Sequence, residues 1–255
     1  MRKAYFSTLH STYNVQGEYM LIRKGIHDIW NAFMVDTASF GPHDIPYCPT
    51  TATSIPKEII TWIDAKSRYK KALQSDHKDF KDPAFVCFYI DDYKFDSSRG
   101  IWHDSKQALK VIKHFGGVIT PDFSTYQDFP LPLSLLATYK MRAFGYWLGT
   151  NDIPVINNVR WGMPSSYSWS FEGLPRKSIL AIGTNGGSPF KVIDRQRFEE
   201  GFLYMISLLE PTDLIIYGSS NYQCIKEAYN KGINIHQFDS HTCKSFKRRI
   251  NNEQK

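Results

Sequence analysis

Long apolar runs and paired cysteines are both missing from this sequence. No stretch approaches the ~18 consecutive apolar residues of a membrane-spanning helix. The first residues, MRKAYFSTLHSTYNVQGEY, lack the apolar segment and small-residue cleavage site of a secretory signal. The four cysteines are scattered, with no CxxC pair. The sequence therefore predicts a cytoplasmic protein without a membrane partner, a zinc module or a disulfide framework.

Short catalytic and cofactor-binding motifs are also absent. The chain contains no GxGxxG, GxxxxGK[ST], GxSxG or HExxH sequence. His236 and His241 flank Asp239, but this spacing is not that of an established metal site. We therefore predict no metal site, and the residues indicate no particular cofactor.

The composition is that of an ordinary globular protein. The 255 residues are 42% hydrophobic and 22% charged, enough for one large domain or two modest ones. The net charge is +6, and the stretch KSFKRR near the C-terminus contributes much of it. This charge is compatible with a phosphate-bearing partner, either a small molecule or a nucleic acid. The oligomeric state is not indicated.

After residue 84 the pattern becomes regular, with short apolar runs alternating with amphipathic segments of helical length. Before it, residues 54–73 predict a helix with Pro56 near its start. Beyond it, the sequence predicts strands at 85–92, 116–124, 154–161, 178–187, 213–220 and 233–240, and helices at 101–115, 131–150, 195–210 and 221–232.

This alternation predicts an α/β fold of six or more βα units around a largely parallel sheet. Because almost every strand ends in polar residues, we favour an incomplete or distorted (β/α) barrel over an open doubly wound sheet. We expect three parts: an irregular and helical region covering the sheet (1–84), an α/β core domain (85–241) and a basic tail (242–255).

The polar strand ends are the candidate site, because parallel α/β proteins bind ligands at the carboxyl ends of their strands. We predict catalytic roles for Asp122, Asn158 and Arg160. Alternation along PVINNVRW places Asn158 and Arg160 on one face and Asn157 on the other, and we expect the first pair to line the interior. A buried guanidinium needs an anionic partner, either a ligand or a structural salt bridge to Asp122 or Glu172.

Other strand ends supply candidate substrate-binding residues. These are Asn157, Thr184, Asn185, Ser219, Ser220 and Asp239. The segment IYGSSNYQ has the physical features of a phosphate-binding turn: a strand, a glycine, hydroxyl groups and a following helix. The alternative is that residues 219–221 only cap that helix.

Five segments resemble the uncharacterised domain-of-unknown-function family numbered 4417, found in bacteria, archaea and their phages. They are ITPDFS (119–124), INNVRWG (156–162), FEGLP (171–175), SILAIGTNGG (178–187) and LIIYGSS (214–220), which together span about half of the chain. Members often carry acidic residues directly after the RWG step, whereas here Met163, Pro164 and Ser165 follow. The family has no established activity, so the resemblance implies a bounded α/β domain of prokaryotic or phage origin and no mechanism.

The first functional hypothesis is an enzyme acting on a phosphorylated or nucleotide-like substrate. Asp122 would act as a general acid/base or metal-bridging carboxylate and Arg160 as an anion clamp. Asn157 or Asn158 would orient the substrate, and the turn at 219–220 would hold phosphate.

Two alternatives remain open. The chain could be a non-enzymatic factor of a phage or mobile element that binds nucleic acid or protein through Lys244, Lys247, Arg248 and Arg249. It could also be an inactive scaffold whose polar strand ends only satisfy one another.

Overall fold

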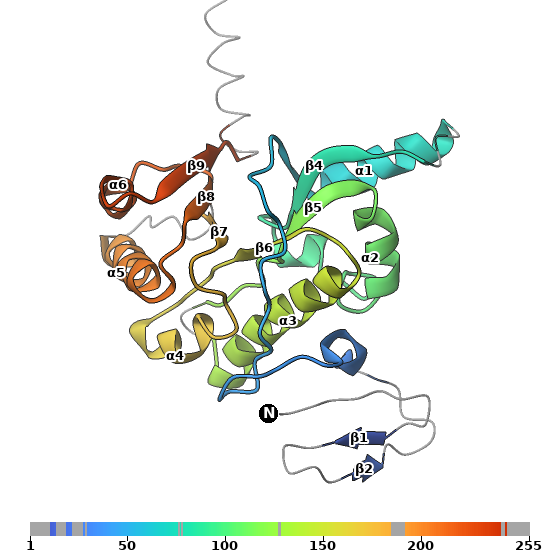
Figure 1. The fold of residues 1–255 in the computed structure, drawn as a ribbon, viewed down its shortest axis with the longest axis horizontal. Helices are drawn as coiled ribbons and strands as arrows, with labels where there is room; N and C mark the ends of the chain where they lie inside the picture. Colours follow the sequence, from blue (N-terminus) through green and yellow to red (C-terminus); the bar gives the residue numbers. More distant parts are fainter. Residues whose placement is uncertain are drawn as a thin grey trace, which may run out of the picture.

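A computed structural model describes residues 11–13, 19–21, 28, 30–75, 77, 79–126, 129–184, 192–240 and 243. Its main feature is a seven-stranded sheet in the order β3-β4-β5-β6-β7-β8-β9 (Figure 1). All neighbouring strands of this sheet are parallel. The strands are β3 (Ile59–Thr61), β4 (Asp82–Cys87), β5 (Phe115–Ile119), β6 (Val155–Asn158), β7 (Ile179–Gly183), β8 (Asp213–Tyr217) and β9 (Asn234–Phe238); β1 (Ser11–Tyr13) and β2 (Tyr19–Leu21) form a separate antiparallel pair.

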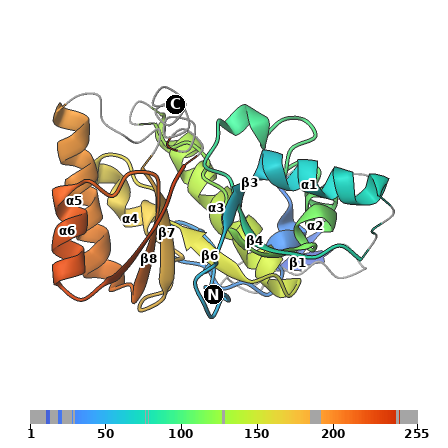
Figure 2. The ribbon, with the colours of Figure 1, turned by 90° about the horizontal axis from the view of Figure 1, so that it is seen from above.

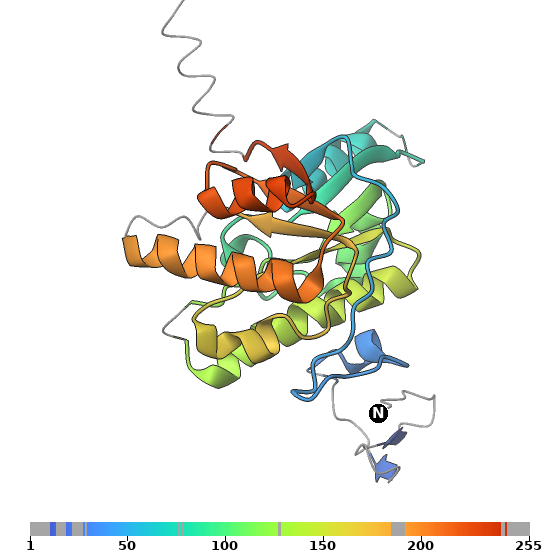
Figure 3. The same ribbon diagram turned by 60° about the vertical axis from the view of Figure 1, so that its left-hand side comes forward.

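The helices lie on the outer side of the curled sheet (Figures 2 and 3). They are α1 (Trp62–Gln74), α2 (Ser105–Ile112), α3 (Leu131–Thr150), α4 (Tyr167–Ser170), α5 (Val192–Leu209) and α6 (Gln223–Asn230), with short 3-10 turns η1 (Ala32–Val35), η2 (Asp92–Lys94) and η3 (Pro164–Ser166). Each strand is bonded to the next strand along the chain, as in a (β/α) barrel. The sheet forms a half-barrel, which confirms the predicted incomplete barrel.

The predicted helix over residues 54–73 is wrong at its start. Residues 59–61 instead form β3, whose Ile59 and Ile60 are buried and pair with Phe85 and Val86. The helix begins only at Trp62, because Thr61 and Asp64 make a capping box at its N-terminus. The sheet thus includes residues before the expected boundary at 84, and the division of the chain into domains stays a prediction.

The predicted strands are also too long at their carboxyl ends. The segment 154–161 forms a strand only from Val155 to Asn158, and it is the fourth strand of seven rather than the third of six. Residues 120–124 and 160–161 lie beyond their strands. Polar residues that were assigned to strands are therefore in the loops at the rim of the half-barrel. The helix predicted at 131–150 has the predicted bounds.

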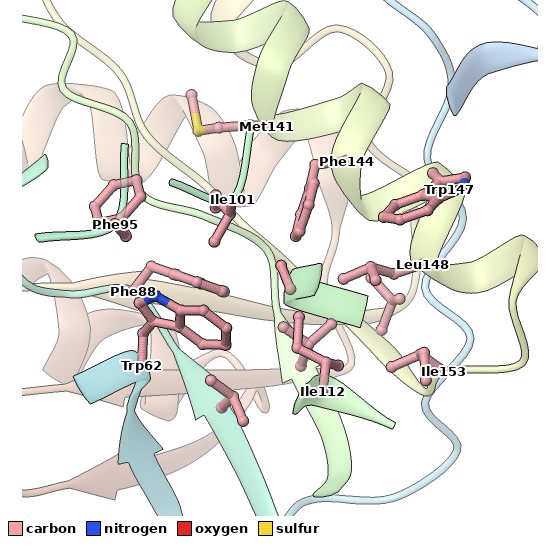
Figure 4. Packing of buried hydrophobic residues seen from close by; sticks show 14 of the residues in the cluster. Trp62, Phe88, Phe95, Ile101, Ile112, Met141, Phe144, Trp147, Leu148 and Ile153 are labelled. Atoms are coloured by element: carbon pink, nitrogen blue, oxygen red, sulfur yellow. The ribbon is translucent and has the colours of Figure 1, made fainter. Parts of the chain in front are cut away.

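The sheet has an apolar core on each face. On the outer face, side chains of α3 such as Phe144 and Leu148 pack toward Phe88 and Ile112 (Figure 4). On the inner face, a smaller cluster joins strand residues such as Cys87, Ile119 and Ile215 to Ala52 of the N-terminal region. Both faces of the central strands are thus apolar until the strands end.

The segment 46–56 passes between β6 and β7 at their amino ends. These strands pair only from Asn157 and Leu180 onward. Below that point, the backbone N–H groups of Thr51 and Ala52 donate to the carbonyl of Val155, at 3.0 and 3.1 Å. The N-terminal region therefore closes this end of the sheet, which leaves the carboxyl end as the place for a site.

Candidate functional site

A chain of hydrogen bonds joins three neighbouring strand ends at the rim. The Tyr89 hydroxyl, after β4, donates to Asn158 Oδ1 at 3.0 Å. Asn158 Nδ2, at the end of β6, donates to Asp122 Oδ1 at 2.8 Å. Arg160 Nη1 donates to the other carboxylate oxygen, Asp122 Oδ2, at 2.9 Å. The three residues predicted to be catalytic are thus in direct contact.

The backbone of Asn158 is held from two sides. Its N–H donates to the hydroxyl of Thr120 at 2.8 Å, and its carbonyl accepts from Arg142 Nη1 at 3.2 Å. Thr120, Arg142 and Asn158 are all fully buried. The side chain of Asn158 is therefore presented to Asp122 from a fixed position.

Asp122 and Arg160 differ in their access to solvent. Asp122 is buried, and this burial raises the pKa of its carboxyl, while Arg160 and Asn158 act in the opposite direction. The Arg160 side chain keeps 18% of its surface exposed. Within the described residues its guanidinium makes one hydrogen bond, through Nη1, so that Nε and Nη2 remain for a ligand.

Tyr89 was not singled out in the sequence, although it completes the network. Its ring stacks on Tyr217 with centroids 5.0 Å apart, and it lies so close to Gly183 that a Cβ there would be 2.5 Å from the ring. Burial holds the pKa of the Tyr89 hydroxyl well above its usual range, so that this group stays a hydrogen-bond donor. Gly183 therefore makes room for the Tyr89 ring.

Arg142 is the second residue that sequence reasoning missed. It lies in α3, is fully buried, and donates to the carbonyls of Glu172 (3.1 Å), Asn158 (3.2 Å) and Ser170 (3.0 Å). It makes no ion pair with a described residue. Burial lowers the pKa of this guanidinium to about 10, which leaves it charged at neutral pH. The available signal was a single arginine within the apolar run MRAFGYWL.

Asn157 and Asn158 contact different parts of the protein, as alternation predicts. Asn157 is buried, and its Nδ2 donates to the carbonyl of Cys48 at 2.8 Å and to the hydroxyl of Thr50 at 3.3 Å. Its described contacts therefore hold the N-terminal segment in place. A role for Asn157 in binding substrate stays a prediction.

The turn after β8 is bonded to the neighbouring strand. Ser220 donates to Gln237 of β9, and Ser219 Oγ accepts from the N–H of Asn221 at 3.2 Å. The helix-cap alternative is wrong, because α6 follows Tyr222 and no side chain caps it. The predicted roles of Ser219 and Ser220 in binding substrate stay untested.

The remaining candidates lie along the same rim or outside the described residues. Thr184 directly follows β7 and is buried, with no partner for its Oγ1 among the described residues. Asp239 directly follows β9. Outside the described residues are Asn185 and the basic residues Lys244, Lys247, Arg248 and Arg249.

Two classes of feature are not found in the described part of the chain. No three His, Cys, Asp or Glu side chains there are grouped as a metal site requires. None of its helices is both long and apolar enough to cross a membrane.

Comparison with known proteins gives a family without an activity. Residues 37–239 match the family described as Domain of unknown function (DUF4417), which confirms the resemblance seen in the sequence. The chain is 31% identical over 144 residues to the Gene 1 protein of Mycobacterium phage L5, covering 56% of this chain and 61% of that protein. It is 26% identical over 204 residues to the Gene 1 protein of Mycobacterium phage D29, covering 80% and 70%. No solved structure matches.

Proposed function

We propose that this chain, which belongs to the family Domain of unknown function (DUF4417), is an enzyme acting on a phosphorylated or nucleotide-like substrate at the carboxyl ends of its strands. The observation that carries the proposal is the contact between Asp122 and Arg160, a buried carboxyl beside a partly exposed guanidinium. In (β/α) barrels, catalytic groups lie at this rim.

Arg160 would bind the anionic group of the substrate. Its bond to Asp122 orients the guanidinium, while Nε and Nη2 keep a side of the planar fork for phosphate oxygens. Its partial exposure admits a ligand without the cost of burying an unpaired charge. The family relatives come from phages, but their printed names state no substrate.

Asp122 would transfer a proton to or from the substrate. Burial raises the pKa of its carboxyl, which brings the group closer to the range useful for acid–base catalysis. Asn158 holds one carboxyl oxygen and Arg160 the other. When phosphate shares the charge of Arg160, the pKa of Asp122 rises further, and the carboxyl becomes a better general acid.

Calorimetry with phosphate esters and nucleotides, combined with assays for their turnover, tests this proposal. Arg160→Ala should weaken binding about tenfold or more, because charge-assisted hydrogen bonds to the phosphate are lost. Asp122→Asn should keep binding and lose turnover. The matched control is Arg176→Ala, since Arg176 is paired with Glu210 on the surface. Equal binding by the Arg160 and Arg176 variants would contradict the proposal.

A further inference from the structure

A cavity lies directly beyond the Asp122–Arg160 pair. The chain after β5 and the chain after β6 approach each other there, since a Cβ on Gly162 would be 3.6 Å from the carbonyl oxygen of Thr125. Together with the start of α3 and with α4, these two segments enclose a cavity of about 130 Å³. The same two segments thus carry the ionic pair and line the cavity.

The lining of this cavity is uncharged. Its hydroxyl groups come from residues such as Thr125 and Ser166, and its aromatic rings include Phe129 and Trp169. None of the residues that line it is Asp, Glu, Lys, Arg or His. Such a lining suits a flat, neutral ring that stacks on aromatic side chains and has both donors and acceptors at its edge.

Thr125 gives an independent sign of a ligand. Its side chain lines the cavity and only 8% of the residue is exposed, yet its Oγ1 has no hydrogen-bond partner among the described residues. A buried hydroxyl without a partner is costly, so such groups are uncommon unless something else satisfies them. Ser166 Oγ already accepts from the N–H of Gly162 at 3.1 Å and keeps its own proton to donate.

The size of the cavity limits the occupant. An apolar protein cavity of ~150 Å³ holds one benzene molecule, so a cavity of about 130 Å³ accommodates a single six-membered ring. Gly162 is two residues from Arg160, a span of at most ~7 Å along an extended chain. A ring in the cavity and a phosphate on Arg160 are therefore separated by no more than a sugar can bridge.

We propose that this cavity binds the pyrimidine base of a nucleotide whose phosphate binds Arg160. The inference rests on the proposed function and narrows its substrate class. Thr125 would hydrogen-bond to the edge of the base, and the aromatic side chains would pack against its face. A purine, with two fused rings, would fit less well.

Calorimetry on the full chain with cytidine and uridine 5′-monophosphates, cytidine, adenosine 5′-monophosphate and ribose 5-phosphate tests the inference. The pyrimidine nucleotides should bind more tightly than adenosine monophosphate or ribose 5-phosphate. Thr125→Val should weaken binding of cytidine and its nucleotide about three- to tenfold, the effect of one hydrogen bond, and leave ribose 5-phosphate unchanged. Its thermal midpoint should be equal or higher, because the variant removes an unpaired buried hydroxyl.

Gly162 provides a second, matched pair of variants. An added Cβ makes only ordinary contacts at 3.6 Å, so Gly162→Ala should bind normally, while Gly162→Leu should fill the cavity and abolish binding of the base. Equal affinity for cytidine monophosphate and ribose 5-phosphate, or no effect of Thr125→Val, would overturn the base site.

The outcomes also separate this inference from the proposed function. Phosphate binding that depends on Arg160 but not on Thr125 or Gly162 overturns the base site alone. Cytidine binding that depends on Thr125, without any effect of Arg160→Ala on a nucleotide, overturns the proposed function alone. Failure of every probe to bind overturns both.

Discussion

Two arginines lie on opposite sides of Asn158 and are stabilised in different ways. Arg142, in α3, is fully buried and donates to three backbone carbonyls. Arg160, beyond β6, is partly exposed and donates to the carboxylate of Asp122. Arg142 thus spends its donors on the fold, whereas Arg160 keeps some of its donors for a ligand. The same residue type is structural on one side of the strand and a candidate for function on the other.

The difference follows from what each arginine could find nearby. Backbone carbonyls left at the end of β6 and in the loop at 170–172 need donors, and Arg142 supplies them from one side chain. Asp122 needs a cation and an amide, which Arg160 and Asn158 supply. Four variants test this comparison.

Arg142→Met should have the largest effect on stability. Methionine keeps much of the volume but leaves three buried carbonyls without this donor, which should lower the free energy of unfolding by about 3 kcal/mol or more. Urea denaturation measures the loss. A loss below 1 kcal/mol would mean that the carbonyls find other donors, and the contrast between the two arginines would fail.

Arg160→Met should have an intermediate effect that depends on pH. The carboxylate of Asp122 loses its charged partner, which costs about 2 kcal/mol near neutral pH. In acid the protonated carboxyl needs no cation, so the loss should shrink. Urea denaturation at pH 4 and pH 7 compares the two, and an equal loss at both would show that the ion pair does not matter.

Asp122→Asn should change how stability depends on pH. Burial raises the pKa of Asp122 above its ordinary value of 3.8, so the folded state holds the proton more tightly than the unfolded state. Ionisation therefore costs stability as pH rises through the ordinary value and then the folded value. The stability of the wild type relative to Asp122→Asn should fall between acid and neutral pH, as denaturation over a pH series would show. A rise would reverse the inferred direction of the pKa shift.

Arg176→Ala should have the smallest effect. Arg176 is largely exposed and paired with Glu210, so its loss should change the free energy of unfolding by no more than about 0.5 kcal/mol. Urea denaturation alongside the Arg142 and Arg160 variants completes the series from buried to exposed. A loss as large as that of Arg160→Met would remove the role of burial from the comparison.

Much of the candidate site could be predicted because it follows from local pattern. The polar residues Asp122, Asn158 and Arg160 each come after an apolar run, and parallel strands bring their carboxyl ends to one edge. The side-chain contacts among them could not be predicted. The salt-bridge alternative left Asp122 and Glu172 equally open for Arg160, and Glu172 instead accepts from His43.

The residues missed by sequence reasoning depend on long-range contacts. Tyr89 fits against β7 because residue 183 is glycine, and Thr125 lines a cavity closed by a segment some forty positions away. The strand β3 is only three residues long, and a run such as EIITWID has no periodicity that separates a strand from the start of a helix. Pairing with β4 decides its conformation.

The sequence by itself determined the class of fold, the family and the edge of the sheet that carries polar side chains. These depend on periodicity, on strand and helix order and on local turn chemistry, which neighbouring residues specify. Only the tertiary structure decided which arginine is bound by carbonyls and which by Asp122, and where a cavity opens beside the pair. The physical reason is that burial and partners arise when distant segments pack together, so that the same guanidinium or hydroxyl acquires its role from residues remote in the chain.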